Sequence, residues 1–284
     1  VDRSADLPRA YLGILKAGGA YVPMLADLPA PRLANMARQA GMRRLIALDG
    51  HQVPAELTTA LAENAGGAAT VLTLDGVDAA AGGEDDTRPA RRGRPGHLAA
   101  VLFTSGSAGQ PKGVLIQHDA CQHMAQGHGV AQGIDERDRV LLASSPGFIL
   151  GFRELCLPLV LGCAWVPATR ALLDAPAALL ASMARRRVSV AMFTPSYLRL
   201  LEGAVPDGLR LLLTAGERPH PQDARHYARH LVYWNMHGAT EVCGTICMHR
   251  VDPHGDGPLP SGRPFPNLSA YLLDEAGHEV APGE

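Results

Sequence analysis

Helical and strand-like hydrophobic patterns alternate along most of the chain. Apolar residues recur every three or four positions over 7–17, and Gly18-Gly19 follows, which predicts a helix that ends at the glycines. The same spacing predicts further helices over 31–41, 55–65, 119–132, 176–185 and from 197 to 201. Short continuous apolar runs predict strands at 20–24, 44–48, 70–74, 97–103, 114–116, 140–143, 188–193, 210–214 and 231–236. Such alternation is typical of an α/β fold with mostly parallel sheets flanked by helices.

One segment between two predicted strands has the composition of a phosphate-binding loop. Residues 104–113 read TSGSAGQPKG. Glycines let the backbone approach an anion closely and turn its N–H groups toward it. The hydroxyl groups add donors, and Lys112 adds a positive charge. The segment departs from the common G-x-x-x-x-G-K-[ST] signature, because Pro111 precedes the lysine and Gly113 follows it.

Length, charge and cysteine content narrow the range of functions. The 284 residues suffice for one large or two medium domains. A net charge of −2 favours neither nucleic acid nor an anionic membrane as a partner, and no apolar run is long enough to span a bilayer. Five cysteines without a C-x-x-C pair predict reduced thiols in a cytoplasmic protein rather than a zinc site. The chain begins at Val1 instead of Met, so we expect an excerpt of a longer protein or a processed product.

The loop resembles the TSGSTGxPKG loop of the acyl-adenylate-forming enzymes, a family of ligases, luciferases and nonribosomal peptide synthetase adenylation domains. Ala108 stands where the family usually has Thr. Four further segments, at 15–23, 148–162, 235–241 and 260–284, resemble the family's motifs in the same order. The resemblance implies the family's N-terminal core, with an α/β core over 1–250 that is incomplete at its N-terminus. It also implies that a β-rich subdomain starts over 251–284, that the family's C-terminal domain is absent, and that the chain is either a fragment or interrupted by an inserted domain after Glu284.

The resemblance also implies a site for ATP and Mg²⁺. In the family, the glutamate of N-x-Y-G-P-T-E and the loop threonine ligate magnesium, which assigns Glu241 and Thr104 to the metal and, with Lys112, to catalysis. His237 replaces the tyrosine that stacks on adenine, and Ala239 replaces the proline. The nucleotide-binding residues implied are Thr104, Ser105, Gly106, Ser107, Gly109, Lys112, Gly216, Glu217, Asn235, His237, Gly238 and Thr240.

The expected acid pocket departs from the pattern of amino-acid-activating members. Ile149 stands where those members have an aspartate that pairs with the substrate α-ammonium, and a buried ammonium without a counter-charge is costly. We therefore expect an acid without an α-amine, such as a 2-keto, 2-hydroxy or aryl acid, although a β-amino acid held from elsewhere is also compatible. Arg153 faces either solvent or a substrate carboxylate. The pocket residues implied are Phe148, Ile149, Leu150, Arg153, Met192, Leu213, Ala215, Met236, Gly244 and Thr245.

The resemblance implies that a carboxylic acid and ATP form an acyl-adenylate and pyrophosphate. The acyl group then passes to a carrier-protein phosphopantetheine thiol in a peptide or depsipeptide synthetase, or to coenzyme A in an acyl-CoA ligase. The implied partners are the acid, the carrier protein and remaining synthetase domains, with an MbtH-like protein as a further candidate. A different class of function also fits the sequence. The departures Ala108, Ile149, His237 and Ala239 are compatible with a catalytically degenerate scaffold or docking module.

Overall fold

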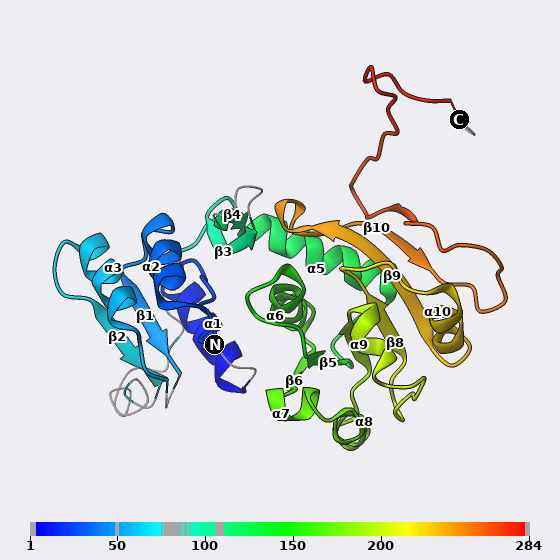
Figure 1. Ribbon diagram of the computed structural model, residues 1–284, viewed down its shortest axis with the longest axis horizontal. Helices are drawn as coiled ribbons and strands as arrows, with labels where there is room; N and C mark the ends of the chain where they lie inside the picture. Colours follow the sequence, from blue (N-terminus) through cyan, green and yellow to red (C-terminus); the bar gives the residue numbers. More distant parts are fainter. Residues whose placement is uncertain are drawn as a thin grey trace.

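A computed structural model describes residues 4–48, 51–74, 76, 87, 90, 92–105 and 111–281. A large sheet with helices on both faces occupies one side of the molecule, and a smaller α/β unit occupies the other (Figure 1). Between them stands the two-stranded ribbon formed by β3 (Leu98–Ser105) and β4 (Pro111–Gln117). None of the helices in the described residues is long and apolar enough to cross a membrane.

Within the described residues, the large sheet has seven strands in the order β11-β10-β9-β8-β7-β5-β6. The neighbouring strands β6, β5, β7, β8 and β9 are parallel, whereas β10 is antiparallel to β9 and β11 is antiparallel to β10. The prediction of an α/β fold is confirmed, and the sheet is mixed because β9 returns directly as β10. The strands are β5 (Arg139–Leu142), β6 (Ala164–Pro167), β7 (Val190–Phe193), β8 (Leu211–Thr214), β9 (Val232–Ala239), β10 (Gly244–Arg250) and β11 (Arg263–Pro264).

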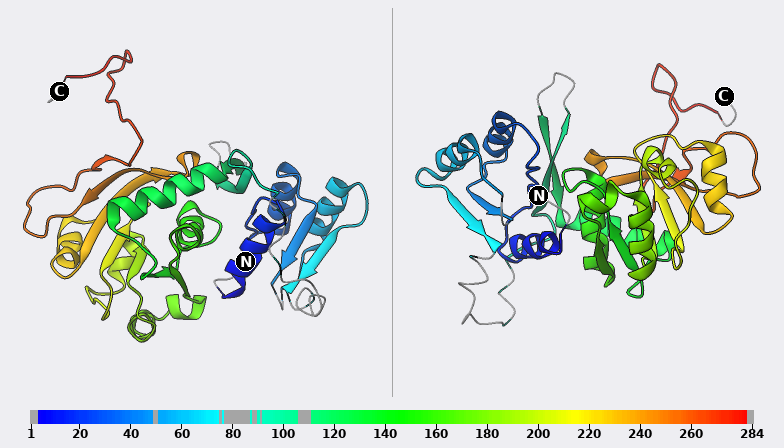
Figure 2. Two further views of the ribbon diagram at one scale, coloured as in Figure 1. Left: turned by 180° about the vertical axis from the view of Figure 1, so that it is seen from behind. Right: turned by 60° about the horizontal axis from the view of Figure 1, so that its bottom comes forward.

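Both faces of the parallel strands are buried, because successive side chains along a strand point to opposite sides. Val190 and Met192 pack into a cluster with α5 (His118–Gln132) and α6 (Ile149–Leu161). Ala191 and Phe193 pack into a second cluster on the opposite face. Figure 2 shows the arrangement of the helices around the sheet from two further directions. The helices of that face are α8 (Pro176–Arg185), α9 (Pro195–Arg199) and α10 (Pro221–Ala228), and the short α7 (Arg170–Leu173) precedes them.

The smaller unit is built by the first quarter of the chain. It contains α1 (Asp6–Lys16), α2 (Ala30–Gln39), β1 (Arg44–Ala47), α3 (Ala55–Ala65) and β2 (Thr70–Thr73), with β1 and β2 parallel. The strand predicted over 20–24 is reduced to one bridge, in which Tyr21 pairs with Ala100 of β3. Pro23 lacks a backbone N–H, so the pairing cannot continue regularly through it. The rings of Tyr11, Tyr21 and Phe152 pack together and join this unit to α6.

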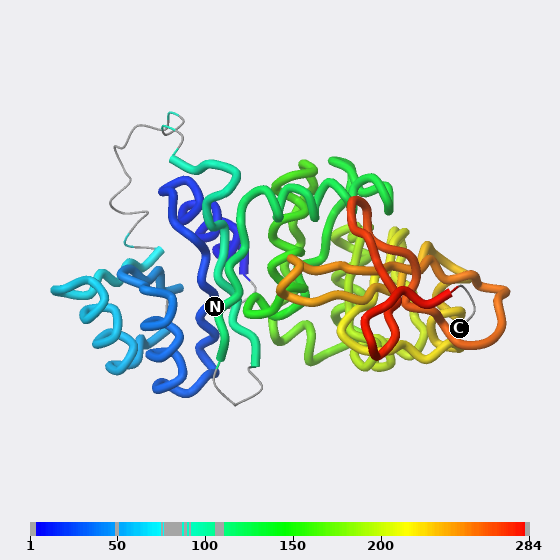
Figure 3. Tube along the Cα trace, turned by 90° about the horizontal axis from the view of Figure 1, so that it is seen from above, coloured from blue at the N-terminus to red at the C-terminus, as the bar shows by residue number. Residues whose placement is uncertain are grey.

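The last segment (251–284), over which we expect a β-rich subdomain to start, contains few strand residues in the part that the structure describes. In the described part, up to residue 281, it contains only β11 and a bridge between Leu273 and Glu279. It leaves the sheet as an extended chain that projects away from the strands in Figure 1 and is therefore seen in front of them in Figure 3. Many of its side chains, including Tyr271 and Leu272, are exposed. The division of the chain at residue 250 therefore stays a prediction.

A charged network ties three strands together at the amino-terminal edge of the large sheet. Asp138, whose side chain is 4% exposed, accepts hydrogen bonds from Arg210 Nε at 2.9 Å and Ser189 Oγ at 2.7 Å. Burial raises the pKa of the Asp138 carboxyl, but the bonds from Arg210, Ser189 and the Asp135 amide outweigh burial and hold that pKa below its ordinary value. The network fixes the starts of β5, β7 and β8 relative to one another.

We expect Asp138→Asn to lower the free energy of unfolding by about 2 kcal/mol, because Arg210 loses a buried counter-charge. The effect is present above the ordinary carboxyl pKa of 3.8 and fades as the pH falls through the lower folded-state pKa. Chemical denaturation at several pH values measures it. Asp174→Asn is the control, since it removes an exposed pair with Arg170 and should change nothing measurable. Equal losses in both variants would contradict this account.

Candidate functional site

The β3–β4 ribbon brings the two ends of the predicted phosphate loop together. Thr104 lies directly opposite Lys112, and Ser105 lies opposite Pro111, in an antiparallel pair. Opposite residues of such a pair project to the same face, so the Thr104 hydroxyl and the exposed Lys112 ammonium flank one another. The predicted loop residues Gly106, Ser107 and Gly109 lie outside the described residues.

A carboxylate lies beside this ribbon although it is distant in sequence. The 3₁₀ helix η1 (Thr240–Val242) connects β9 to β10 and packs against β4 (Figure 1). It carries Glu241, which is exposed, and Thr240, which is half-buried. The structure therefore places η1, which carries Glu241, against the ribbon that carries Thr104 and Lys112.

The residues present fit a magnesium ion that also binds phosphate. A hydroxyl and a carboxylate are hard oxygen ligands, which Mg²⁺ prefers, and Mg²⁺ usually retains water and substrate phosphate in its coordination shell. Thr104 and Glu241 supply one ligand of each kind. Among the described residues, no group of three or more His, Cys, Asp or Glu is placed to hold a metal ion by itself. A metal here would thus depend on the nucleotide.

A pocket of about 670 Å³ opens at the carboxyl ends of β8 and β9. Six predicted nucleotide- or acid-binding residues line it, namely Gly216, Glu217, Asn235, Met236, His237 and Gly238. Ligands in open α/β sheets commonly bind at such strand ends. Arg218 and the segment 258–261, which close the other side of the pocket, were not predicted from the sequence. The proline-rich composition of that segment gave no chemical signal, and only the fold brings it to β9.

Two glycines are required by the backbone of this pocket. Gly216 has a φ of +88°, a left-handed conformation that side chains with a Cβ rarely adopt. A Cβ on Gly238 would lie 1.7 Å from the carbonyl oxygen of Gly244, so no side chain fits where β9 and β10 approach one another. Gly238 thereby keeps the turn into η1 close to the sheet.

The polar residues of this pocket have different environments. His237 is exposed, whereas Asn235 is 8% exposed and donates from Nδ2 to the Pro260 carbonyl at 3.5 Å. Glu217 accepts a hydrogen bond from the Ser196 amide at 2.9 Å, at the first turn of α9. The predicted nucleotide residue Glu217 therefore also holds α9 in place.

Most of the predicted acid-pocket residues converge between α6 and the sheet. Leu150, Met192, Leu213, Ala215 and Met236 pack into one hydrophobic cluster. Ile149 and Arg153 are one helical turn apart on α6, and both face β10. A Cβ on Gly244 would lie 3.8 Å from Ile149, and Arg153 Nη1 donates to Thr245 Oγ at 3.0 Å. Phe148 is the exception, since it caps the start of α6 and is 63% exposed.

The side chain of Arg153 is buried, not directed to solvent. It is 1% exposed, and Nη1 lies 3.4 Å from His128 Nε2. Burial and the nearby Arg153 charge lower the pKa of His128 to about 3, so this imidazole is neutral at physiological pH. Burial also lowers the pKa of Arg153 to about 10, against the raising effect of Glu154, and the guanidinium stays charged.

Glu154 is buried and follows Arg153 in the sequence, but its hydrogen bonds are made with other residues. Its carboxylate accepts hydrogen bonds from the amides of Ala143 and Ser144 at 2.8 Å and from Ser144 Oγ at 2.6 Å. Burial raises the pKa of Glu154 to about 7, although these bonds and Arg153 oppose the shift. Glu154 thus anchors the loop between β5 and α6, which aims the first turn of α6 at β10.

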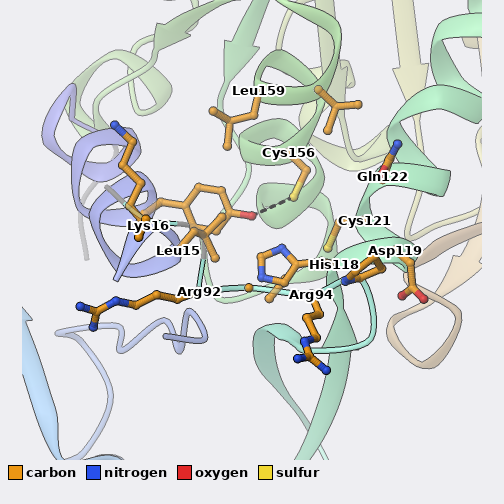
Figure 4. A pocket seen from close by; sticks show the side chains of 16 residues that line it. Leu15, Lys16, Arg92, Arg94, His118, Asp119, Cys121, Gln122, Cys156 and Leu159 are labelled. Atoms are coloured by element: carbon orange, nitrogen blue, oxygen red, sulfur yellow. Dashed lines mark hydrogen bonds between the residues drawn. The ribbon is translucent and has the colours of Figure 1, made fainter. Parts of the chain in front are cut away.

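A second pocket, of about 460 Å³, lies between α1, the start of α5 and the end of α6 (Figure 4). Its floor includes Cys121 and Cys156, and Cys156 Sγ lies 3.2 Å from the Tyr11 hydroxyl. The charged ends of Lys16, Arg92 and Arg94 point away from this floor. None of the predicted nucleotide or acid residues lines this pocket.

Several curated proteins with similar sequences are peptide synthetases. The chain is 32% identical over 289 residues to a linear gramicidin synthase protein of Brevibacillus parabrevis, covering 100% of this chain and 4% of that protein. It is 34% identical over 292 residues to phosphinothricin tripeptide synthetase PhsB of Streptomyces viridochromogenes, covering 99% of this chain and 24% of that protein. The chain therefore spans only a small part of the length of these relatives.

Solved structures share the fold over nearly the whole chain. An anthranilate CoA ligase, AuaEII, in complex with anthranoyl-AMP matches with a TM-score of 0.82 at 21% identity, over 99% of this chain and 56% of that chain. The N-terminal subdomain of Klebsiella oxytoca NpsA in complex with 3-hydroxybenzoyl-AMSN matches with a TM-score of 0.79 at 22% identity, over 99% of this chain and 70% of that chain. The nonribosomal peptide synthetase FmoA3 matches with a TM-score of 0.78 at 25% identity, over 95% of this chain and 29% of that chain.

A protein-family model described as AMP-binding enzyme matches residues 1–284. This range includes the ribbon, the pocket at the strand ends and the helix α6. It agrees with the peptide synthetase relatives and with the shared fold. The chain therefore belongs to the AMP-binding enzyme family.

Proposed function

We propose that this chain activates a carboxylic acid with ATP and that the acyl group is then loaded onto a carrier-protein thiol of a peptide or depsipeptide synthetase. The observation that carries the proposal is that Thr104 and Lys112 lie opposite one another on the β3–β4 ribbon and that η1, which carries Glu241, packs against β4. Strand β9, which leads into η1, lines the pocket at the carboxyl ends of β8 and β9. The peptide synthetase relatives support carrier loading over transfer to coenzyme A. A cytoplasmic location, where ATP is available, stays a prediction.

In the proposed reaction, a carboxylate oxygen of the acid attacks the α-phosphorus of ATP. The bond from that phosphorus to the bridging oxygen breaks, and pyrophosphate leaves with the bond's electrons, giving an acyl-adenylate. Lys112 offsets negative charge that builds on the phosphate oxygens, which is the main way proteins accelerate phosphoryl chemistry. Thr104 and Glu241 would hold Mg²⁺, which supplies further charge compensation when bound.

The pocket lined by Gly216, Asn235 and His237 suits the nucleoside part of ATP. The left-handed backbone at Gly216 leaves room for a ligand to approach the strand end. The exposed imidazole of His237 offers a planar surface for stacking on adenine. Neutral polar groups such as Asn235 provide hydrogen bonds without introducing a charge beside the base.

The residues in the first turn of α6 favour a substrate acid that lacks an α-amine. Ile149 is half-buried and lies close to Gly244, so a substrate ammonium at this place would lack the counter-charge that an aspartate at position 149 would supply. A 2-keto, 2-hydroxy or aryl acid would avoid that cost. Two proteins with the same fold carry aryl ligands, anthranoyl-AMP and 3-hydroxybenzoyl-AMSN, which supports an acid of this kind without identifying it.

Lys112→Ala should reduce acid-dependent ATP–pyrophosphate exchange by about 100-fold or more, because the charge that faces the phosphates is lost. The assay uses the full-length protein that contains this chain. Lys16→Ala is the matched control, since Lys16 is the other lysine of the sequence and is exposed on α1. Exchange that survives Lys112→Ala unchanged would remove Lys112 from the mechanism.

Glu241→Gln should raise the Mg²⁺ concentration needed for half-maximal exchange by about 10-fold, because an amide oxygen is a weaker ligand than a carboxylate. A magnesium titration of the exchange rate measures the shift. Glu136→Gln alters an exposed glutamate in the turn before β5 and should leave the titration unchanged. If both variants titrate like the natural protein, Glu241 is not a metal ligand.

Ile149→Asp should allow exchange with α-amino acids, because the new carboxylate supplies the counter-charge that an α-ammonium needs. The measurement compares exchange with matched pairs of acids that differ only in the α-amine. Ile149→Leu keeps the site apolar and should retain the natural preference. If the natural protein already activates the α-amino acid of each pair better than the acid without the α-amine, the inference drawn from Ile149 is wrong.

A further inference from the structure

The Arg153 guanidinium is a buried positive charge to which the described residues offer no carboxylate in a hydrogen bond or salt bridge. Its polar neighbours are the Thr245 hydroxyl at 3.0 Å, the His128 imidazole at 3.4 Å and the thioether sulfurs of Met192 and Met236. Thioethers are weak acceptors, and Arg153 Nε has no hydrogen-bond partner. Burying a charge against neutral dipoles alone is costly.

Glu154 raises the pKa of Arg153 through its charge, but it makes no hydrogen bond or salt bridge to the guanidinium. Both oxygens of Glu154 are occupied by Ala143 and Ser144, on the side of α6 that faces the β5–α6 loop. His128 is directed by Gln132, whose side-chain oxygen lies 2.9 Å from Nδ1. With the proton on Nδ1, the imidazole presents a neutral acceptor at Nε2. The described residues thus organise the surroundings of the guanidinium but form no direct ion pair with it.

Arg153 lies directly behind one wall of the pocket at the strand ends. Met236 lines that pocket and also accepts a hydrogen bond from Arg153 Nη1 at 3.5 Å. The other thioether neighbour, Met192 of β7, is aligned through β8 with Trp234 of β9, so it lies two residues before Met236 along the sheet. Methionine side chains are unbranched and adapt easily to a new neighbour. A shift of these two side chains would connect the guanidinium with the pocket without moving the backbone.

We propose that the substrate is a dicarboxylic acid, whose second carboxylate binds Arg153 while the first reacts with ATP. This proposal rests on the proposed function, because it names the substrate of the same site. A carboxylate matches the planar guanidinium with two parallel hydrogen bonds, and it would use the unpaired Nε. Because Ile149 leaves an α-ammonium without a partner, the acid lacks an α-amine. The apolar side chains around Arg153 fit the methylene groups between the two carboxylates.

The test measures ATP–pyrophosphate exchange by the full-length protein with dicarboxylic acids from malonic to adipic acid. Each is paired with the monocarboxylic acid of the same length, and aryl and α-amino acids complete the panel. The proteins compared are the natural one, Arg153→Met, Arg153→Lys and, as a surface control, Arg170→Met. Thermal unfolding of each protein is followed with and without ATP and the preferred acid. Arg153→Met replaces the charge with an apolar chain of similar length.

We expect the natural protein to prefer a dicarboxylic acid. Arg153→Met should lower kcat/KM for this dicarboxylic acid by about 100-fold, and it should change kcat/KM for the paired monocarboxylic acid by less than about threefold. Arg153→Lys should retain part of the preference, and Arg170→Met all of it. The melting temperature of Arg153→Met should be equal or higher, because an uncompensated buried charge has been removed. A purely structural arginine would instead lower it.

A preference of the natural protein for a monocarboxylic acid would overturn this proposal and leave the proposed function standing. So would an unchanged preference in Arg153→Met. An absence of exchange with every acid would refute the proposed function itself, and this inference with it. If Arg153→Met fails to fold, the panel measured on the natural protein and on Arg153→Lys still decides between these outcomes.

Discussion

The structure depends on the burial of both faces of its parallel strands. Alternate side chains of β7 and β8 enter two separate hydrophobic clusters, so the strands cannot shift by one residue without exposing both. Asp138 and Arg210 fix the opposite, amino-terminal edge. As a result, the carboxyl ends of β7, β8 and β9 are held at one edge, where Gly216, Asn235 and Gly238 form the pocket. The pocket at the strand ends is therefore a consequence of the fixed register of the parallel strands.

Elements with a clear period were predictable from the sequence, whereas others were not. The helices over 55–65 and 176–185 were predicted to the residue, because their apolar positions repeat at helical spacing. Helix α6 was missed, since ILGFRELCLPLVL is apolar nearly all round and contains Pro158. Strand β10 was missed because GTICMHR mixes small, apolar and polar residues with no strict alternation.

The site was predictable in its residues but not in its electrostatics. The loop motif identified Thr104 and Lys112, and their opposite placement follows from a simple hairpin register. The partners of Arg153 come from segments 25 to 92 residues away in sequence. No local pattern could show that these partners are neutral. Only the folded chain distinguishes a buried, unpaired guanidinium from an arginine at the surface, and this distinction changes the expected substrate.

Acid activation is the central claim, and acid-dependent exchange of labelled pyrophosphate into ATP tests it most directly. The full-length protein would be assayed with keto, hydroxy, aryl, dicarboxylic, β-amino and α-amino acids, each with and without Mg²⁺. We predict magnesium-dependent exchange with at least one acid that lacks an α-amine. Absence of exchange with every acid, together with no detectable ATP binding, would contradict acid activation and favour a scaffold or docking role for this fold.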